Sequence, residues 1–465
     1  MTRFLPLSRT RALALGALAL AGCASMAPRY ERPAAPVADT FPQSENVPVG
    51  SAVAIDWRDF CADARLRRLV EIALANNRDL RVAMLDVETA RAQLGLQRAA
   101  EFPSLSLAAG EDRVTGQPTV FSTGIAVSSW ELDLWGRVRS LSAAAAAQLA
   151  ATEEGRKAAQ ITLVASVANA DVTLGADDEQ LDLAQRTLVT RADTLALTQL
   201  RFDHGVASDL DLQDARSLVE AARVAVASAQ RQQLIDQDAL VLLLGQPLPA
   251  DLPAATPWRD FTLPDVPAGL PSDVLLERPD VRQAEHQLIA ANADIGAARA
   301  AFFPTVTLTG SYGTASSQFD KLFDHRAFTF VPQLVLPIFD AGRNRANLNA
   351  SEANRDIAVA QYEKAIQSAF RDVADALAGR ATLSDQLRAQ QALADAEQRR
   401  YELTSLRFEH GVASSLDLLD SQRSLFTAQQ ATVATRMALL QNRIALYRAL
   451  GGGWTEPAAQ TANAR

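Results

Sequence analysis

The chain has 465 residues, of which 48% are hydrophobic, so it is too long and too apolar to be a disordered tail and it can bury a large core. Its formal net charge is −9, and its arginines are scattered rather than gathered in a basic stripe, which argues against nucleic-acid binding. Aromatic residues make up only 6%, whereas alanine, leucine, glutamine, arginine and aspartate recur throughout, as is typical of long helices packed side by side.

The N-terminus has the pattern of a secretory signal. Three arginines among the first eleven residues precede an apolar run from Ala12 to Ala21, which is too short to span a bilayer as a helix and has the length of a signal-peptide core. It leads into Leu20-Ala21-Gly22-Cys23, which resembles the bacterial lipobox. We expect residues 1–22 to be a lipoprotein signal peptide and Cys23 to become the acylated first residue of the mature protein. An ordinary signal peptide with a chance cysteine is the alternative.

Two neighbouring observations extend this expectation. Aspartate after the acylated cysteine would indicate retention in the inner membrane, so Ala24 favours transfer to the outer membrane. The only other cysteine, Cys61, has no disulfide partner in the chain once Cys23 is lipidated. We expect Cys61 to be a small buried hydrophobic residue.

The chain consists of two tandem halves. Residues 197–214 read LTQLRFDHGVASDLDLQD and residues 403–420 read LTSLRFEHGVASSLDLLD, identical at 14 of 18 positions with an offset of 206. A second match, AAEFPSLSLAAG from residue 99 and AAFFPTVTLTGS from residue 300, lies at an offset of 201. Such repetition predicts two copies of one structural unit. We assign an extended, lipid-anchored segment at 23–55, a first repeat at 56–246, a proline-rich linker at 247–271, a second repeat at 272–454 and a flexible tail at 455–465.

Each half has the same predicted order of elements. A helix (Leu66–Ala99; Ser272–Ala301) precedes two short alternating segments, a very long helix (Gly136–Phe202; Gly342–Phe408), a tight turn and a further helix. At a rise of about 1.5 Å per residue the very long helices reach roughly 90 to 100 Å, which no compact globule needs. Apolar or small side chains recur at helical spacing. These are Tyr362, Ile366, Ala369, Val373, Leu377 and the run Ala143–Ala147.

The alternating segments predict four strands. Thr305–Tyr312 alternates polar and apolar residues with period two, and the first half offers a less regular pattern around Leu105, Leu107 and 121–135. One face of the partner strand is apolar, at Phe328, Phe330, Leu334 and Leu336. An apolar face opposite a Thr/Ser face suits a membrane barrel with a wet lumen, and a soluble sheet packed on helices is the alternative. Four strands cannot close and lipid does not tolerate open edges, so several chains must pool their strands.

The duplicated R-F-[DE]-H-G-V-A-S motif, the ending LYRALGGGW at 446–454 and the lipobox resemble the TolC-like outer-membrane efflux factors, in their NodT-type lipoprotein branch, over about residues 23–454. The resemblance implies a mainly α fold with a small β part: a homotrimer with a twelve-stranded transmembrane β-barrel, a long α-helical barrel crossing the periplasm, and an equatorial belt around the linker and termini. It implies an outer-membrane channel that passively conducts substrates from an inner-membrane transporter and a periplasmic adaptor. A duct for protein secretion or metal-ion efflux is the alternative.

Motifs for catalysis and metal binding are missing from the sequence. The histidines, at His204, His286, His325 and His410, have no metal-ligand spacing, and Gly451–Gly453 follow a predicted helix and lack the lysine of a phosphate loop. We expect no enzyme activity, no metal and no cofactor apart from the covalent lipid on Cys23. Two other classes compete: an envelope enzyme, which would need a concave polar site, and a coiled-coil spacer, which would not need Thr-rich strands.

The duplicated motif predicts a helical hairpin in each half. Glycine takes a left-handed cap and serine starts the next helix. These roles leave unexplained the valine and alanine in an exposed turn and the arginine one turn earlier. The resemblance implies that the turns dock the periplasmic adaptor. The predicted docking residues are Arg201, Gly205, Val206, Ala207 and Ser208 in the first half and Arg407, Gly411, Val412, Ala413 and Ser414 in the second.

Acidic residues follow each turn. Asp211 and Asp417 stand at the third helical position, where they complete a capping box with the serine. Asp214 and Asp420 lie three residues further on, beyond the free backbone amides and on nearly the same face. The resemblance implies that such positions form the entrance constriction. The predicted gate is Leu416, Asp417 and Asp420, supported by Asp211 and Asp214; solvated acids at helix starts are the alternative.

Overall fold

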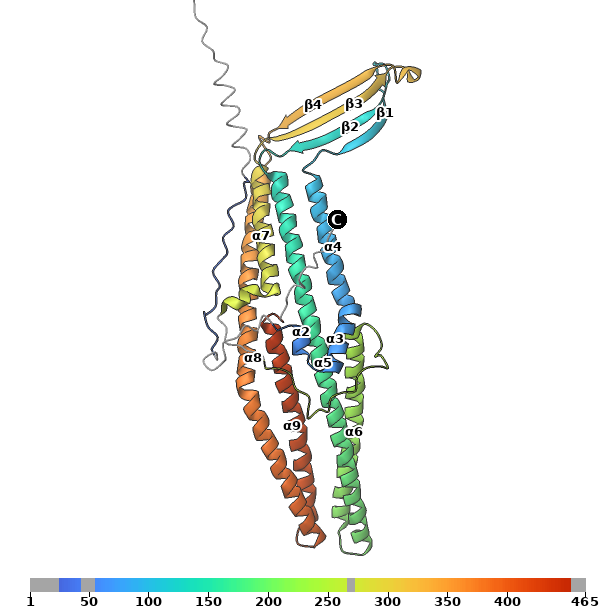
Figure 1. Cartoon of the computed structure of the whole chain (residues 1–465), viewed down its shortest axis with the longest axis vertical. Coiled ribbons are helices and arrows are strands. Elements are labelled where there is room, and N and C mark those ends of the chain that lie inside the picture. The colour runs from blue at the N-terminus through green and yellow to red at the C-terminus, as the bar shows by residue number, and fades with distance from the viewer. Residues whose placement is uncertain (1–24, 43–54, 266–271, 453–465) are drawn as a thin grey trace, which may run out of the picture. The chain divides into compact units, whose positions relative to one another are not determined.

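The computed structural model describes residues 25–42, 55–265 and 272–452, so the signal peptide and Cys23 lie outside the described residues. The two halves repeat one order of elements (Figure 1). The first half contains α2 (Trp57–Phe60), α3 (Ala64–Asn76), α4 (Arg78–Ala99), β1 (Leu105–Asp112), β2 (Val120–Leu132), α5 (Arg137–Asp203) and α6 (Asp209–Leu244). The second contains η3 (Ser272–Glu277), α7 (Pro279–Ala300), β3 (Thr305–Ser316), η4 (Phe319–Lys321), β4 (Arg326–Val335), α8 (Arg343–Glu409) and α9 (Ser415–Ala449).

The chain divides into two compact units, and each unit draws on both halves. The first unit contains residues 84–155 and 280–365 together with the described residues up to Pro36, and it holds the sheet. The second contains residues 37–83, 156–279 and the described part from Ile366 onward, and it holds the helical hairpins.

The four predicted strands are confirmed. They form one antiparallel sheet in the order β1-β2-β3-β4, in which the central pairing of β2 with β3 joins the two halves. Between Val127 and Trp130 the register of β2 shifts by a bulge. There Ser129 takes a left-handed φ of 48°, and its N–H donates to Thr309 Oγ1 at 3.2 Å. The hydroxyl thus satisfies an amide that the bulge removes from the ladder.

The very long helices begin and end within one residue of the predicted ranges. Both α5 and α8 contain 67 residues, which corresponds to roughly 100 Å at about 1.5 Å per residue. All five side chains of the predicted apolar stripe on α8 are buried, from Tyr362 to Leu377. In the alanine run of α5, Ala144 and Ala147 are buried. Small side chains let neighbouring helices approach closely. The apolar stripe of α8 and the alanine run of α5 therefore both lie in helix-packing interfaces.

In the second unit the long helices turn back as hairpins. α5 continues into α6, and α8 continues into α9. α6 contacts α3 and α9, and α5 binds α9 through glutamines: Gln180 donates to the Gln430 carbonyl at 3.2 Å and Gln441 to Thr173 Oγ1 at 3.3 Å. The two turns lie at the same end of this unit, side by side (Figure 1).

The expectation of one unbroken first helix in each half is wrong. In the first half the backbone is extended at Asn77, between α3 and α4. The Asn77 side chain accepts from the Leu80 N–H at 2.9 Å and donates to the Leu243 carbonyl at 2.9 Å, so it starts a new helix while binding α6. In the second half a 3-10 turn precedes α7, which begins at Pro279 because proline suits a first helical position.

The described part of the proline-rich segment, residues 247–265, contains no helix or strand. It nevertheless packs within the second unit: Trp258, Phe261 and Leu263 are buried. Arginines of α9 hold its backbone, since Arg436 donates to the Phe261 carbonyl at 3.1 Å and Arg443 to the Leu263 carbonyl at 2.7 Å. Backbone carbonyls that lack a ladder partner are thereby satisfied.

The described N-terminal residues 25–42 also lack helix and strand. Within the first unit residues 25–36 run against α7, where the Arg32 guanidinium donates to Glu285 at 2.7 Å and the Tyr30 hydroxyl donates to the same carboxylate at 3.0 Å. Asn292 adds a bond to the Pro28 carbonyl at 2.8 Å. Because Glu285 is buried, these donors compensate the desolvation of its charge, and they tie the segment after the predicted anchor to the fold.

Candidate functional site

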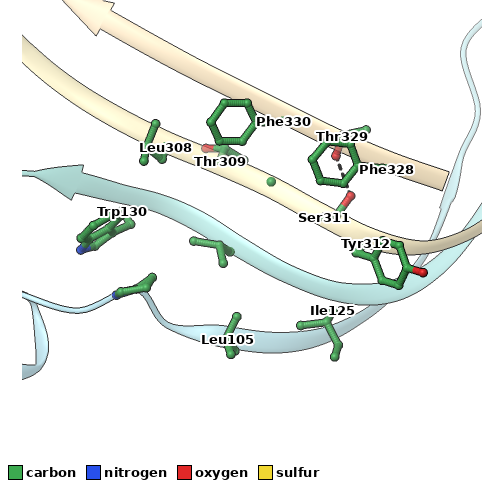
Figure 2. A pocket seen from close by; sticks show the side chains of 13 residues that line it. Leu105, Ile125, Trp130, Leu308, Thr309, Ser311, Tyr312, Phe328, Thr329 and Phe330 are labelled. Atoms are coloured by element: carbon green, nitrogen blue, oxygen red, sulfur yellow. Dashed lines mark hydrogen bonds between the residues drawn. The ribbon is translucent and has the colours of Figure 1, made fainter.

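The sheet has two chemically different faces. Paired residues on one face are apolar across all four strands, for example Leu107 with Ile125, Ile125 with Tyr312, and Tyr312 with Phe328. Figure 2 shows the aromatic and aliphatic side chains of this face, with Trp130 and Phe330 among them, lining a hollow of the sheet. Since side chains alternate across a strand, the intervening residues define the opposite face.

That opposite face carries hydroxyl and small side chains. Thr307, Thr309 and Ser311 alternate with the apolar residues of β3, and the Ser311 hydroxyl bonds the hydroxyl of Thr329 on β4 at 2.6 Å (Figure 2). The predicted pairing of an apolar face with a Thr/Ser face is therefore present, and it now includes the first half, where the sequence pattern is irregular.

Aromatic pairs stand near both ends of the strands. Trp135 and Phe303, which lie just outside β2 and β3, stack with ring centroids 4.7 Å apart, and the Trp135 indole donates to the Pro304 carbonyl at 2.9 Å. At the other end Phe121 meets Phe319 edge to face at 5.5 Å. Aromatic girdles of this kind flank the apolar band of strands that cross an outer membrane.

Each hairpin turn ends its long helix by the same hydrogen bonds. The N–H of Val206 donates to the Arg201 carbonyl at 2.8 Å and that of Gly205 to the Phe202 carbonyl at 2.9 Å, which is a Schellman motif. Gly205 and its counterpart Gly411 both have a φ of 72°, where a side chain would introduce strain. Val412 repeats the bond of Val206, to the Arg407 carbonyl.

The serine after each turn forms a complete capping box. The Ser208 hydroxyl accepts from the Asp211 N–H at 3.1 Å and donates to the Asp211 carboxylate at 2.6 Å. Likewise, the Ser414 hydroxyl accepts from the Asp417 N–H at 3.2 Å and donates to the Asp417 carboxylate at 2.7 Å. These bonds to serine hold the pKa values of both carboxyls below their usual range. Asp211 and Asp417 are therefore ionised at neutral pH and already engaged in starting their helices.

Apolar side chains at the turns are left uncovered. Val206 is 76% exposed and Val412 is 66% exposed, while Ala207 and Ala413 are half-buried. A Schellman motif is commonly accompanied by a hydrophobic contact from this position, but in both turns most of the valine faces solvent. Helix termination therefore does not account for the two valines.

Arg201 has a structural role that the sequence does not predict. Its guanidinium donates to the Phe408 carbonyl at 3.1 Å and lies over the Phe408 ring, with its carbon atom 4.1 Å from the ring centroid. It thereby joins the two hairpin turns within the second unit. The signal available in the sequence was the repeated arginine, but its target lies in the other repeat.

The predicted gate residues lie on the first two turns of α6 and α9. Leu416 is exposed, and Asp420 forms an ion pair of 2.5 Å with Arg400 on α8. Asp214, the counterpart of Asp420, is exposed and has no side-chain hydrogen bond or ion pair with any described residue. Arg400 was not singled out in the sequence, although a hairpin that turns at Gly411 necessarily brings its region of α8 opposite Asp420.

The remaining polar candidates are unremarkable. His204 and His410 are exposed at the turns, and within the described residues no group of three or more potential ligands could hold a metal ion. Cys61 is buried, as expected, and burial raises the pKa of its thiol to about 12. Of the helices that the structure describes, none has both the length and the apolarity needed to cross a membrane.

The features together define a repeat protein that pairs an amphipathic, open-edged sheet with long helical hairpins. The family model of the outer membrane efflux protein matches residues 69–246 and again 270–452. The chain therefore belongs to the outer membrane efflux protein family, a family of transport proteins rather than of enzymes or spacers. Its two matches correspond to the two halves of the chain.

Individual relatives agree with this assignment. The chain is 46% identical to outer membrane protein OprJ of Pseudomonas aeruginosa over 456 residues, 95% of each chain, and 44% identical to the probable efflux pump outer membrane protein TtgC of Pseudomonas putida over 470 residues, 96% of each chain. Among solved structures, the open state of the MtrE outer membrane channel of Neisseria gonorrhoeae superposes with a TM-score of 0.85 at 39% identity, covering 92% of this chain and 98% of MtrE.

Proposed function

We propose that this chain forms the outer-membrane exit duct of a tripartite efflux system and passively conducts substrates delivered by an inner-membrane pump and a periplasmic adaptor. The observation that carries the proposal is the sheet: an apolar face, a hydroxyl-lined face and two edge strands, β1 and β4, that have no partner within the described chain. A sheet of this kind is typical of a transmembrane β-barrel, in which one face contacts lipid and the other faces an aqueous lumen.

The proposed assembly is a homotrimer. Unpaired N–H and C=O groups along β1 and β4 are not tolerated in hydrocarbon, so strands from neighbouring copies must complete the ladder. Three copies would supply twelve strands for a closed barrel, with the apolar face outward and the Thr/Ser face toward a wet lumen. The long hairpins would extend into the periplasm as a helical barrel.

Relatives indicate the class of substrate. Proteins 44% identical to the chain are named as the outer membrane proteins of an antibiotic efflux pump, ArpC, and of a toluene efflux pump, TtgC, both from Pseudomonas putida. A further relative at 42% identity is named for solvent efflux. We therefore favour small, mostly apolar toxic molecules over secreted proteins or metal ions as the exported substrates.

The duct should conduct ions and support export. Purified protein in a planar bilayer should produce stepwise currents, because a lumen lined by hydroxyl groups admits water. Expression together with a related pump and adaptor should restore antibiotic tolerance to a strain that lacks its own outer-membrane channel. The same strain without the pump is the control and should stay sensitive. Absence of current both from the correctly assembled wild type and from its Leu416→Ala, Asp420→Ala variant would overturn the proposal.

We further propose that the two turns dock the adaptor through Arg201, Arg407 and the Gly-Val-Ala-Ser residues that follow each arginine by four positions. Two exposed valines, Val206 and Val412, lie at the tips of the hairpins, where a docked partner would remove their apolar side chains from water. Gly205 and Gly411 permit the left-handed φ of the turns, and the backbone hydrogen bonds to the Arg201 and Arg407 carbonyls fix their geometry, so the docking surface is preorganised.

A photo-crosslinking residue in place of Val206 or Val412 should capture the adaptor in cells. Val224 on α6 is a matched control, since it is an exposed valine outside the turns. A photo-crosslinker there should capture little adaptor. Capture from Val224 but from neither turn would refute docking at the turns.

We also propose a gate formed by Leu416, Asp417 and Asp420, with Asp211 and Asp214 in support, and a lipid anchor at Cys23. Exposed Leu416 side chains from three copies would exclude water at the axis, and the Arg400–Asp420 ion pair would reduce repulsion among the acids. A relative, MtrE, has a channel structure described as an open state, which is what a gated duct requires.

A further inference from the structure

The repeated motif could form two equivalent arginine–phenylalanine contacts between the hairpin turns, but the described chain forms one of them. Both repeats carry an arginine followed by a phenylalanine, Arg201-Phe202 and Arg407-Phe408. Arg201 binds the carbonyl and the ring face of Phe408. The reciprocal contact, Arg407 on Phe202, is not made: the Arg407 side chain has no hydrogen bond or ion pair with any described residue. Arg407 and Phe202 therefore lack, within the described chain, the contact that Arg201 and Phe408 make.

Burial shows the same asymmetry. Phe408 is only 5% exposed, whereas Phe202 is 37% exposed. Higher on the hairpins Leu440 is 4% exposed, and Leu234, which matches it at the repeat offset of 206, is 60% exposed. Because each pair has the same residue type, the difference reflects neighbours and not sequence. The first repeat thus leaves open to solvent side chains that the second repeat buries.

The two arginines also differ in their surroundings. The Arg201 side chain points to Phe408, and the pKa of Asp211 is lowered only by its bonds to Ser208. The Arg407 side chain, at the C-terminal end of α8, instead adds its charge to the lowering of the pKa of Asp417 at the start of α9. Unlike Arg201, Arg407 therefore makes no contact with a phenylalanine ring within the described chain.

We propose that Arg407 of one copy clasps Phe202 of a neighbouring copy of this chain, donating to the Phe202 carbonyl and covering its ring as Arg201 does for Phe408 within the chain. The proposal rests on the oligomer proposed above. The Phe202 carbonyl lies at the C-terminal end of α5, where the helix dipole favours a cation, and the exposed ring offers a face for cation–π contact. The occupant is a second copy because it supplies the same motif in the complementary position.

The interchain clasp makes the ring of turns continuous. Clasps within chains, from Arg201, would alternate with clasps between chains, from Arg407, so that every turn is held to two neighbours. The proposed interchain contact is limited to the turns. Further along the hairpins the two repeats carry different residues at equivalent positions, for example Thr194 in the first and Arg400 in the second.

Thiol crosslinking of the full-length, membrane-assembled protein distinguishes the two clasps. In a Cys61→Ala background, Phe202→Cys with Arg407→Cys should be joined between chains by a short bis-maleimide and migrate as dimers and trimers in denaturing gels. The matched pair Arg201→Cys with Phe408→Cys should be joined within one chain and stay at monomer size. Each single-cysteine variant should give no product beyond background.

Each result decides the question. Dimers and trimers from the 202/407 pair alone support the interchain clasp. Monomer-sized product from that pair, or no product while the 201/408 pair reacts, overturns it but leaves the duct intact if native mass measurement still finds an oligomer. A protein that is monomeric in the membrane overturns both the clasp and the proposed oligomer.

A second measurement avoids cysteines. Arg407→Ala should lower the temperature at which the detergent-solubilised oligomer dissociates by several degrees, and Arg407→Lys should recover only part of the loss, because lysine lacks the planar fork of arginine. Arg388→Ala removes another exposed arginine of α8 and should leave dissociation unchanged. Equal behaviour of Arg407→Ala and Arg388→Ala would overturn the clasp.

Discussion

Replacing Leu416 and Asp420 together by alanine should raise the single-channel conductance several-fold and let large antibiotics leak into cells. Leu416 is exposed on the first turn of α9, and in the proposed closed trimer three copies would form an apolar ring that excludes water. Asp420→Ala also removes the ion pair with Arg400, which ties α9 to α8. Loss of both features favours the open state.

The expected effect is large because the proposed closed state would be only marginally stable. An exposed ion pair contributes about 0.2–1 kcal/mol, so three Arg400–Asp420 pairs that form only in the closed state would together shift the closed–open equilibrium by a factor of roughly 3 to 150. Widening the ring at Leu416 acts in addition, since a hydrophobic constriction conducts only when it wets.

The first repeat offers a matched control. Leu210 and Asp214 occupy the equivalent positions, but Asp214 has no ion pair with a described residue and Thr194 stands where the second repeat has Arg400. Leu210→Ala with Asp214→Ala should therefore change conductance less. Conductance equal to the wild type in a trimeric Leu416→Ala, Asp420→Ala protein would exclude these residues as the gate.

Replacing Cys23 by alanine should abolish lipidation and leave an unprocessed or mislocalised precursor. The predicted lipid attachment needs the Cys23 thiol, and each buried methylene of an acyl chain contributes about 0.8 kcal/mol to membrane anchoring. Several acyl chains lost together mean near-complete loss of the anchor. Mass spectrometry of the mature N-terminus and membrane fractionation measure both effects.

Cys61→Ala is the matched control for this experiment. Cys61 is buried and its thiol pKa is raised by burial to about 12, so it is unreactive and takes no part in processing. The variant should be lipidated and localised like the wild type. An unmodified Cys23 at the N-terminus of wild-type mature protein would refute the anchor.

Local patterns in the sequence determined much of this protein. Period-two alternation in 305–312 predicted a strand, helical spacing from Tyr362 to Leu377 predicted a buried stripe, and the Gly-Val-Ala-Ser turns predicted two hairpins. Each of these signals arises from a chain that repeats its geometry every two or every 3.6 residues. The 206-residue offset predicted that both halves would share one fold, since near-identical segments fold alike.

Breaks within helices were not predictable in this way. The sequence around Asn77 reads as one continuous helical pattern, and the break depends on a bond from Asn77 to the Leu243 carbonyl, a residue far along the chain. A similar limit applied to the irregular first-half strands, whose faces are defined by pairing with β3. Local propensity is a weak guide wherever a distant partner decides the conformation.

The sequence by itself determined which residues form the turns, the capping boxes and the faces of the strands, because these depend on neighbours within a few positions. Only the tertiary structure decided what the repeated residues contact. Arg201 and Arg407 occupy identical motifs, yet Arg201 covers Phe408 while Arg407 has no such partner among the described residues. Duplication gives both repeats the same motif, but within one folded chain the two repeats have different neighbours. The contact of Arg201 with Phe408 is therefore made within the chain, whereas the equivalent contact of Arg407 with Phe202 is not.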